Sequence, residues 1–394
     1  MFGMIRVGIT VVFALLVTAT AWAGNWNQGN SSSTNLTVDV WKKNNVPIAV
    51  KNNLQKAGLN SIADWSGCSS VRSAGNTDQT IDNAFRDGWS HFVFIVCIDK
   101  MFPTPEHRLN LEIATAKIDA LEAQITRMSK KHPDRLFVIS LKSREVIGGW
   151  AKKGIRTTYV YDAYEKKISV REDYIKLWEM IAQKTAHIPQ TQLAFNLMNE
   201  PEFHNVAVNR TNTWGKYANE LIGEIREISP QRTIIVEGVF KSNLGRQQSA
   251  SDMMPVVNHD NIVYGFHHYQ PYDFTHWKKA GGKKFTSEIK RKVQTSLRGM
   301  ISFSKSNKVP VILSEVGVWG PYPTNGKPIS GISFQDRAAF MRVVKEETLD
   351  KGIGLTWWAL FDLKTPYKRL SEGKLQSSME KDDLLWEVLQ LNTK

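Results

Sequence analysis

The sequence predicts one α/β domain in which eight parallel strands alternate with helices and close into a (β/α)8 TIM barrel. The stretch Leu193–Met198 is apolar except for Asn196 and is bounded by prolines, so it predicts a buried parallel strand. Val311–Leu313 has the same form. Each strand leads into a carboxylate, Glu200 or Glu315, at the end where α/β barrels carry their chemistry.

The first half of the chain alternates between helical and strand patterns. Asp39–Lys56 predicts a cap helix beneath the barrel. Apolar residues recur on one face of the helix predicted at Leu109–Lys130, which indicates a helix packed against a sheet. The other elements predicted here are helix Thr80–Asp87, strand Gly88–Val96, strand Leu136–Leu141, helix Tyr174–Thr185 and strand Leu193–Met198.

The second half repeats the alternation without an internal repeat or a linker, so residues 51–394 are predicted to form a single domain. Its predicted elements are helix Trp214–Ile228, strand Thr233–Val236, strand Asn261–His267, helix Lys284–Asn307, the strand that carries Glu315, helix Phe334–Thr348 and strand Gly354–Trp358.

The N-terminus resembles a signal peptide. A short basic start is followed by the mostly apolar run Val7–Val17 and by Ala21-Trp-Ala23, a small-residue cleavage signal before Gly24. We therefore expect residues 1–23 to be removed and the protein to be secreted or periplasmic. Residues 24–50 are expected to form a lead-in and cap. No other apolar stretch reaches the length of a membrane span.

The chain is basic, with 51 Lys and Arg against 38 Asp and Glu. Runs such as Lys290-Arg-Lys292 are mixed with polar and apolar residues, so they fit solvated helix faces. The alternative is that the positive charge attracts an acidic polysaccharide or an anionic cell surface. No nucleic-acid-binding motif accompanies the charge, so no nucleic-acid partner is predicted.

Two strands that each deliver one glutamate suit the cleavage of a glycosidic bond. One carboxylic acid protonates the leaving oxygen, while the other attacks the anomeric carbon from about 5 Å away. The separation between Glu200 and Glu315 leaves room for several βα units. An ordinary loop acid at a strand exit is the alternative for Glu200 alone.

Four motifs in order make the chain resemble glycoside hydrolase family 5, the cellulase-type family. They are Asn199-Glu-Pro201, His267-His-Tyr-Gln-Pro271, Ser314-Glu-Val-Gly317 and Trp357-Trp358. The similarity runs from about Gly58 to the C-terminus, and Ala57–Trp65 resembles the family's first barrel strand. The resemblance implies an endo-acting, retaining β-glycanase that needs no metal or other cofactor.

The resemblance also implies residue roles. Glu200 is expected to be the acid/base and Glu315 the nucleophile. Asn199 is expected to contact the sugar 2-hydroxyl, and Tyr269 to hydrogen-bond the nucleophile. The remaining expected substrate-binding residues are His267, Trp358 as a flat floor for a pyranose ring, Lys142 and Trp319. Trp65, Trp150 and Trp277 could also line a cleft, although core packing explains each of them equally well.

Two positions depart from the family pattern. Val93 stands where the second strand usually carries an arginine that steadies the nucleophile, and Ser140-Leu-Lys142 replaces a third-strand Asp-Leu-His. Without the arginine, Glu315 loses a cation that favours its charged form. We expect Lys142 to supply a replacement charge, without the bidentate geometry of arginine.

Cys68 and Cys97 are the only cysteines. Both follow or end adjacent early strands, and an exported protein permits a disulfide between them. Two buried free thiols are the alternative.

The sequence thus predicts an exported, monomeric hydrolase of a polysaccharide, β-glucan or related, with an acidic substrate left open. A catalytically impaired barrel that binds polysaccharide during its synthesis or export is the alternative that Val93 and Lys142 favour. A transglycosylase shares every motif.

Overall fold

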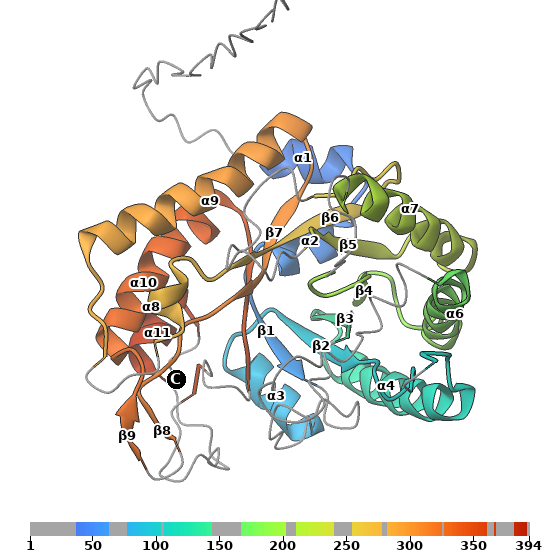
Figure 1. Cartoon of the computed structure of the whole chain (residues 1–394), viewed down its shortest axis with the longest axis horizontal. Helices are drawn as coiled ribbons and strands as arrows, with labels where there is room; N and C mark the ends of the chain where they lie inside the picture. Colours follow the sequence, from blue (N-terminus) through green and yellow to red (C-terminus); the bar gives the residue numbers. More distant parts are fainter. Residues whose placement is uncertain are drawn as a thin grey trace, which may run out of the picture. The chain divides into compact units, whose positions relative to one another are not determined.

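The chain divides into two compact units, Met1–Thr34 and Asn35–Lys394, and the following description concerns the second. The computed structural model describes residues 37–62, 77–103, 106–143, 167–201, 210–239, 254–277, 282–324, 327–360, 366–367 and 382–391 (Figure 1).

Strands of the described ranges form a closed parallel barrel in the order β1-β10-β7-β6-β5-β4-β3-β2, which confirms the predicted (β/α)8 fold (Figure 1). Parallel strands need covering helices on their outer side, and the runs of apolar residues supply buried surface on both faces. The barrel strands are β1 (Ala57–Ile62), β2 (His91–Cys97), β3 (Leu136–Lys142), β4 (Leu193–Asn196), β5 (Thr233–Glu237), β6 (Ile262–His268), β7 (Val311–Val316) and β10 (Leu355–Trp357).

Several helices around the barrel begin where a side chain caps their free N–H groups. Thr77, Asn110, Thr286 and Ser333 each accept a hydrogen bond from a backbone N–H three residues on. The helices are α1 (Thr37–Lys43), α2 (Ile48–Leu54), α3 (Asp78–Arg86), α4 (Leu111–Lys131), α6 (Ile168–Lys184), α7 (Arg210–Ile228), α8 (Tyr272–Thr275), α9 (Ser287–Asn307), α10 (Phe334–Glu347) and α11 (Asp383–Leu389), with a 3-10 turn at Leu349–Lys351.

The predicted cap helix Asp39–Lys56 is wrong as a single helix, because the chain breaks between α1 and α2. Pro47 disfavours a helical conformation at the residue before it, and Asn45 adopts a left-handed conformation with φ 56°. Strands β8 (Tyr322–Thr324) and β9 (Lys327–Ser330) form an antiparallel pair that was not predicted.

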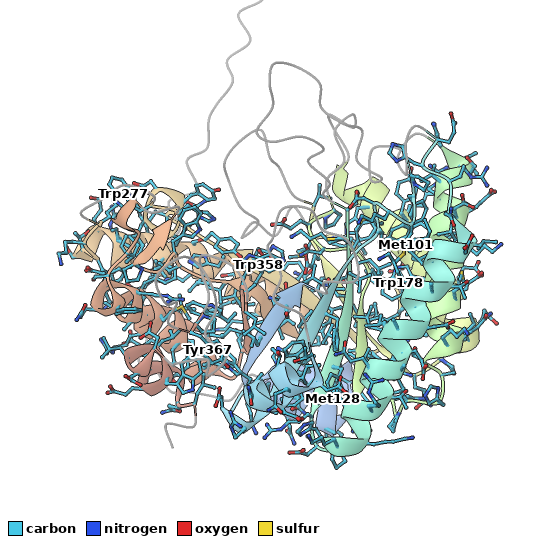
Figure 2. All side chains as sticks on the ribbon, turned by 90° about the horizontal axis from the view of Figure 1, so that it is seen from below. Met101, Met128, Trp178, Trp277, Trp358 and Tyr367 are labelled. Carbon is cyan, nitrogen blue, oxygen red and sulfur yellow. The ribbon has the colours of Figure 1, made fainter. Side chains whose placement is uncertain are left out.

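The core has two layers. The outer layer lies between the strands and the helices, and includes Trp178 of α6 and Met128 of α4. The inner layer fills the barrel with aliphatic side chains such as Val93 and Ile312, and α2 closes its lower end with Leu54. Trp358 belongs to the inner layer and lies near the carboxyl ends of the strands, which are drawn as arrowheads, whereas Met128 lies toward the opposite end of the barrel (Figure 2).

Among the helices of the described ranges, none combines the length and apolar character that a bilayer crossing requires.

Candidate active site

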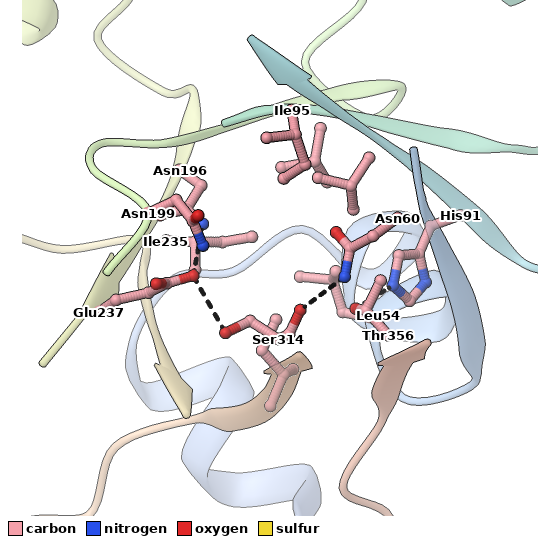
Figure 3. Close-up of a pocket in the computed structure, with 13 residues that line it drawn as sticks. Leu54, Asn60, His91, Ile95, Asn196, Asn199, Ile235, Glu237, Ser314 and Thr356 are labelled. Carbon is pink, nitrogen blue, oxygen red and sulfur yellow. Dashed lines mark hydrogen bonds between the residues drawn. The ribbon is translucent and has the colours of Figure 1, made fainter. Parts of the chain in front are cut away.

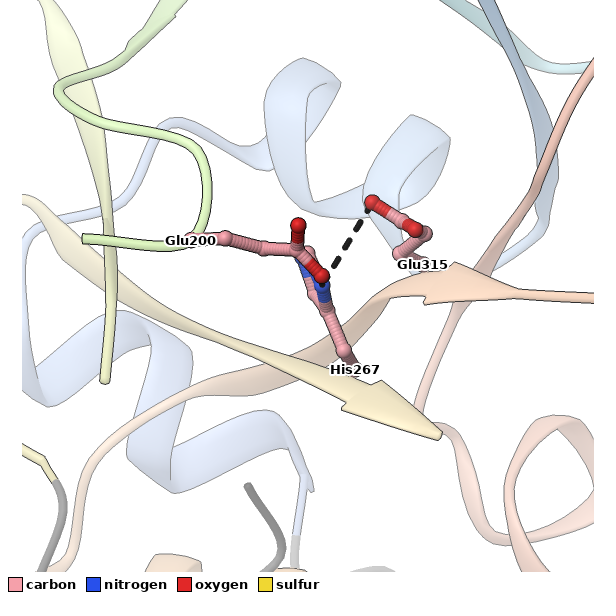
Figure 4. A group of neighbouring side chains, drawn as sticks. All are labelled: Glu200, His267 and Glu315. Atoms are coloured by element: carbon pink, nitrogen blue, oxygen red, sulfur yellow. Dashed lines mark hydrogen bonds and ion pairs between the residues drawn. The ribbon is translucent and has the colours of Figure 1, made fainter. Parts of the chain in front are cut away.

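Two glutamates meet at the carboxyl end of the barrel. Glu200 follows β4, and Glu315 lies in β7. Together with His267 of β6, they present one polar atom each within 4.8 Å of one another (Figure 4). Glu315 is 4% exposed, and the side chain of Glu200 is 10% exposed. The structure therefore brings together residues that are 115 positions apart in the sequence, taking 315 minus 200.

Glu315 is held from three sides. The Tyr269 hydroxyl donates a hydrogen bond to its Oε1. Its Oε2 lies 3.4 Å from Asn199 Nδ2 and 3.4 Å from His267 Nδ1. These contacts fix the orientation of the carboxylate and stabilise its negative charge.

Glu200 has different neighbours. Its Oε1 lies 3.1 Å from His267 Nδ1, and its Oε2 lies 3.8 Å from Lys142 Nζ. The backbone at Glu200 is left-handed, with φ 50°, which is costly for a residue with a side chain. The Glu200 N–H donates a hydrogen bond of 2.9 Å to Glu237 Oε2, and this bond holds the unusual conformation.

Glu237, the last residue of β5, is a third carboxylate that the sequence reasoning missed. It is 1% exposed. Besides Glu200 N–H, it accepts hydrogen bonds from Asn196 Nδ2 at 2.7 Å and Ser314 Oγ at 3.1 Å, and its Oε2 lies 2.9 Å from His267 Nε2. Burial opposes its ionisation, but His267 and these hydrogen bonds outweigh that effect and lower the pKa of Glu237.

The signal for Glu237 was present in the sequence. Thr233–Val236 is an apolar strand followed at once by a glutamate, the same pattern that singled out Glu200 and Glu315. The strand was predicted to stop one residue early, so the carboxylate at its end received no role.

His267 is a buried histidine among carboxylates. It is 1% exposed, and burial by itself lowers the pKa of an imidazole. The negative charges of Glu237 and Glu315, the hydrogen bond to Glu200 and the 2.9 Å approach of Glu237 outweigh burial and raise the pKa of His267 well above its usual value.

Lys142 does not replace the missing arginine beside Glu315, and that expectation is wrong. In the described part of the chain its ion pair is with Glu200, and its Nζ lies 4.4 Å from the centre of the Trp358 ring. Lys142 is the last residue of β3, and its ammonium lies over Trp358. The cation next to Glu315 is His267 instead.

Val93 is one of the residues that line a small cavity inside the barrel, and Figure 3 shows this cavity with Glu237 in its wall. The cavity measures about 10 Å³, which is room for roughly one water molecule. Its polar wall includes Asn196, Glu237 and Ser314, and Asn60 Nδ2 donates a 3.0 Å hydrogen bond to the Ser314 carbonyl.

The other aromatic candidates lie further out. Trp358 is 7% exposed. The half-buried Trp319 lies 6.0 Å from the ring of His276, which in turn lies 5.2 Å from the ring of Tyr269. Trp319 is therefore one aromatic ring away from the residues around Glu315. Trp65 and Trp150 lie outside the described residues.

Cys97 is disulfide-bonded. Cys68, the other cysteine of the sequence, lies outside the described residues, so its pairing with Cys97 stays a prediction that the mass of the alkylated, unreduced protein checks.

The barrel is similar to solved structures of cellulose-related proteins. The endoglucanase Cel5A of Thermotoga maritima has a TM-score of 0.63 at 18% identity, covering 86% of this chain and 99% of that one. Cellulose synthase subunit Z of Clostridioides difficile has a TM-score of 0.61 at 20% identity, covering 85% and 99%. At these identities the similarity establishes the fold.

Two curated relatives are similar over part of the sequence. Endoglucanase 3 of Fibrobacter succinogenes is 25% identical over 189 residues, which is 46% of this chain and 28% of that protein. Cellodextrinase A of Ruminococcus flavefaciens is 32% identical over 109 residues, 27% of this chain and 29% of that protein. The match therefore spans less than a third of each of these two relatives.

The family described as Cellulase (glycosyl hydrolase family 5) matches residues 146–362, more than half of the 394-residue chain. This range contains both glutamates, Asn199, His267, Tyr269 and Trp358. The chain belongs to glycosyl hydrolase family 5.

Proposed function

We propose that the protein is an endo-acting, retaining β-glycanase that hydrolyses a polysaccharide with Glu315 as nucleophile and Glu200 as acid/base. The observation that carries the proposal is the approach of Glu200 and Glu315 atoms to within 4.8 Å. Retaining glycosidases have carboxyl groups about 5 Å apart, whereas inverting enzymes separate them by about 6.5–9.5 Å to admit a water.

In the first step, Glu315 attacks the anomeric carbon and the bond to the leaving oxygen breaks. Glu200 gives its proton to that oxygen and becomes negatively charged. In the second step, Glu200 takes a proton from water, which attacks the same carbon and releases Glu315 as a carboxylate. The donors on Glu315, from Tyr269 and Asn199, hold the carboxylate in a fixed orientation before the attack.

The pyranose ring at the cleavage point would lie over Trp358, with Asn199 near its 2-hydroxyl. Lys142 lies over the same tryptophan and beside Glu200, so it would meet the substrate or its leaving group. The ammonium can donate to sugar hydroxyls or pair with an acidic substituent. A panel of polysaccharides tests which sugar forms the backbone of the substrate and whether the substrate carries acidic groups.

The test is to incubate the purified protein with a panel of neutral and acidic β-glucans, mannans and xylans and to measure new reducing ends. Glu315→Gln and Glu200→Gln are the matched controls, because they keep side-chain shape while removing the nucleophile or the acid/base. We expect activity on at least one polymer, with the Glu315→Gln variant reduced by roughly 10³-fold or more. The anomer released first, followed by proton NMR, should have the configuration of the substrate.

Release of the opposite anomer would overturn the retaining mechanism. Binding without cleavage of any polymer would instead favour the polysaccharide-binding barrel, the alternative that Val93 suggests, although Glu200, Glu315 and Tyr269 are assembled. Transfer of glycosyl units to added sugar acceptors in place of water would identify a transglycosylase.

Export is a separate part of the proposal, supported by the pattern of residues 1–23. N-terminal sequencing of the protein recovered outside the cytoplasm should find Gly24 first. Size-exclusion chromatography tests the proposed monomer.

A further inference from the structure

The buried pair of Glu237 and His267 has no assigned role in the two-glutamate chemistry. We propose that Glu237 is a positioning residue that holds His267 as an imidazolium between Glu200 and Glu315, and so places a positive charge beside the nucleophile where Val93 provides none. This proposal rests on the proposed function for its catalytic consequence, but the charge arrangement can be measured without any substrate.

The contacts of Glu237 suit this role. Its Oε2 lies 2.9 Å from His267 Nε2, while the opposite ring nitrogen, Nδ1, lies 3.1 Å from Glu200 and 3.4 Å from Glu315. Both Glu237 and His267 are 1% exposed, so water does not screen their attraction. Asn196 and Ser314 hold the second carboxylate oxygen of Glu237 from the neighbouring strands.

The fold leaves space for Glu237 through a glycine. A Cβ added at Gly265 of β6 would lie 3.1 Å from Glu237 Cγ and 2.7 Å from Ser314 Oγ, which is closer than real Cβ contacts allow for the serine. A side chain at position 265 would therefore displace Ser314 or the carboxylate from its place next to His267.

Two other buried histidines show what burial does without a carboxylate. His91 contacts the Asn53 carbonyl and Thr356 Oγ1, and its pKa is lowered to about 4. His268, next to His267 in sequence, points to the other side of the sheet, stacks on Phe340 and has a pKa lowered to about 3. Burial makes both rings neutral.

The acidic groups around His267 come from three elements. Glu237 ends β5, Glu200 follows β4 and Glu315 lies in β7, while Lys142 of β3 is the other cation, beside Glu200. With Glu200 protonated for catalysis, the two remaining carboxylates balance His267 and Lys142, so these five groups sum to zero charge. A neutral His267 would leave an unbalanced negative charge in a buried site.

The position of Nδ1 has a further consequence for the reaction. Before the attack, Glu315 carries the negative charge and Glu200 carries the proton, so the Nδ1–H stabilises Glu315. After the attack, Glu315 is an uncharged ester and Glu200 is a carboxylate, and the same N–H can stabilise Glu200. Glu200 Oε1 and Glu315 Oε2 both lie within 3.4 Å of His267 Nδ1. The imidazolium can therefore stabilise the carboxylate that is charged in each step without moving far.

The experiment follows the ring nitrogens of His267 by nitrogen NMR from about pH 5 to about pH 9, the range in which histidines ordinarily titrate. The wild type and Glu237→Gln are compared, with His267→Gln used only to assign the signals. We expect wild-type His267 to remain doubly protonated at pH values where a free histidine is already neutral, and to titrate at lower pH in Glu237→Gln, because the amide removes the opposing charge.

Activity gives the second readout. In Glu237→Gln, kcat should fall about tenfold or more with a smaller change in KM, and its alkaline limb should move to lower pH as His267 loses its proton. Ser314→Ala is the matched control: it removes one hydrogen bond to Glu237 but keeps the charge, so His267 should remain doubly protonated. If Glu237→Gln does not fold, Glu237→Asp, which draws the carboxylate back, should lower the pH at which His267 titrates.

A neutral His267 in the wild type at neutral pH would overturn the proposal, and so would an unchanged titration of His267 in Glu237→Gln or, where that variant does not fold, in Glu237→Asp. If His267 titrates as expected while no polysaccharide is cleaved, the charge arrangement is supported and the proposed hydrolase activity fails by itself.

Discussion

The position of Lys142 in the structure changes the pH dependence that we expect when its charge is removed. Its ammonium lies 3.8 Å from Glu200, the proposed acid/base, so Lys142→Met takes a positive charge from beside the ionised form of that group. We expect the alkaline limb of kcat/KM to move to higher pH by about one unit, while the acidic limb stays in place. Lys142→Arg keeps the charge, so the alkaline limb of kcat/KM should stay at the pH found for the wild type.

A pH–rate profile of the purified variants measures this shift. An upward movement of the acidic limb in Lys142→Met, with the alkaline limb fixed, would mean that the ammonium supports Glu315 instead. A change confined to KM for acidic substrates would place Lys142 against a charged group of the polymer.

The two neutral buried histidines should make the fold sensitive to acid. The pKa values of His91 and His268 are lowered to about 4 and about 3, so the unfolded chain takes up protons below about pH 6.5 that the folded chain does not. Lowering the pH from about 6.5 to about 5 should therefore cost about 2 kcal/mol of unfolding free energy for each histidine.

Urea unfolding at the two pH values checks this. His268→Asn should remove about half of the pH dependence, whatever its effect on stability at neutral pH. His267 has the opposite sign, because its raised pKa gives a contribution that is complete below about pH 6.5 and is lost only at higher pH. A stability that does not change over this acidic range would contradict the neutral state of His91 and His268.

At the scale of elements, the end of α2 lies very close to Gly354, the residue before β10. A Cβ added at Gly354 would lie 1.6 Å from the backbone oxygen of Leu54, so a side chain there must push the closing helix away from the barrel. We expect Gly354→Ala to destabilise the protein by about 2–3 kcal/mol or more.

Gly223 in α7 is the matched control. A Cβ there meets nothing within 4 Å, and the residue lies inside a helix. Gly223→Ala should stabilise the protein by about 0.5–1 kcal/mol. Thermal unfolding of the two variants measures both effects, and equal melting temperatures would contradict this packing of α2 against β10.

Elements that form through interactions between residues near each other in the sequence were the ones that the sequence predicted. Periodicity gave the barrel strands and the long helices, because each pattern is local. Local patterns also gave Glu200 and Glu315, and the resemblance to the family added Tyr269, which the structure gathers with them. The break at Pro47 was readable from the sequence and was missed.

The partners of charged side chains could not be predicted in this way. The sequence places Lys142 one strand from Val93, which suggested that it takes over the arginine's role, but its direction over Trp358 depends on how the closed barrel arranges its strands. The state of His267 depends on carboxylates from three other segments, and Glu237 becomes significant only when all three are seen together.

For the whole molecule, the net charge of +13 has a measurable consequence. If it attracts an acidic polysaccharide, KM for a carboxymethylated glucan should rise as salt is added, since exposed charges are screened over about 10 Å at 0.1 M salt. KM for the uncharged glucan with the same backbone should stay constant. A KM that is insensitive to salt for both polymers would assign the lysines and arginines to solvated helix faces.

Val93 has a consequence for redesigning the barrel. An arginine at position 93 would place a long charged side chain in a cavity of about 10 Å³, where Glu237 forms part of the wall. The guanidinium would compete with His267 for that carboxylate, so Val93→Arg alone would disturb the contact between Glu237 and His267. A design that introduces the arginine would therefore have to change position 237 as well.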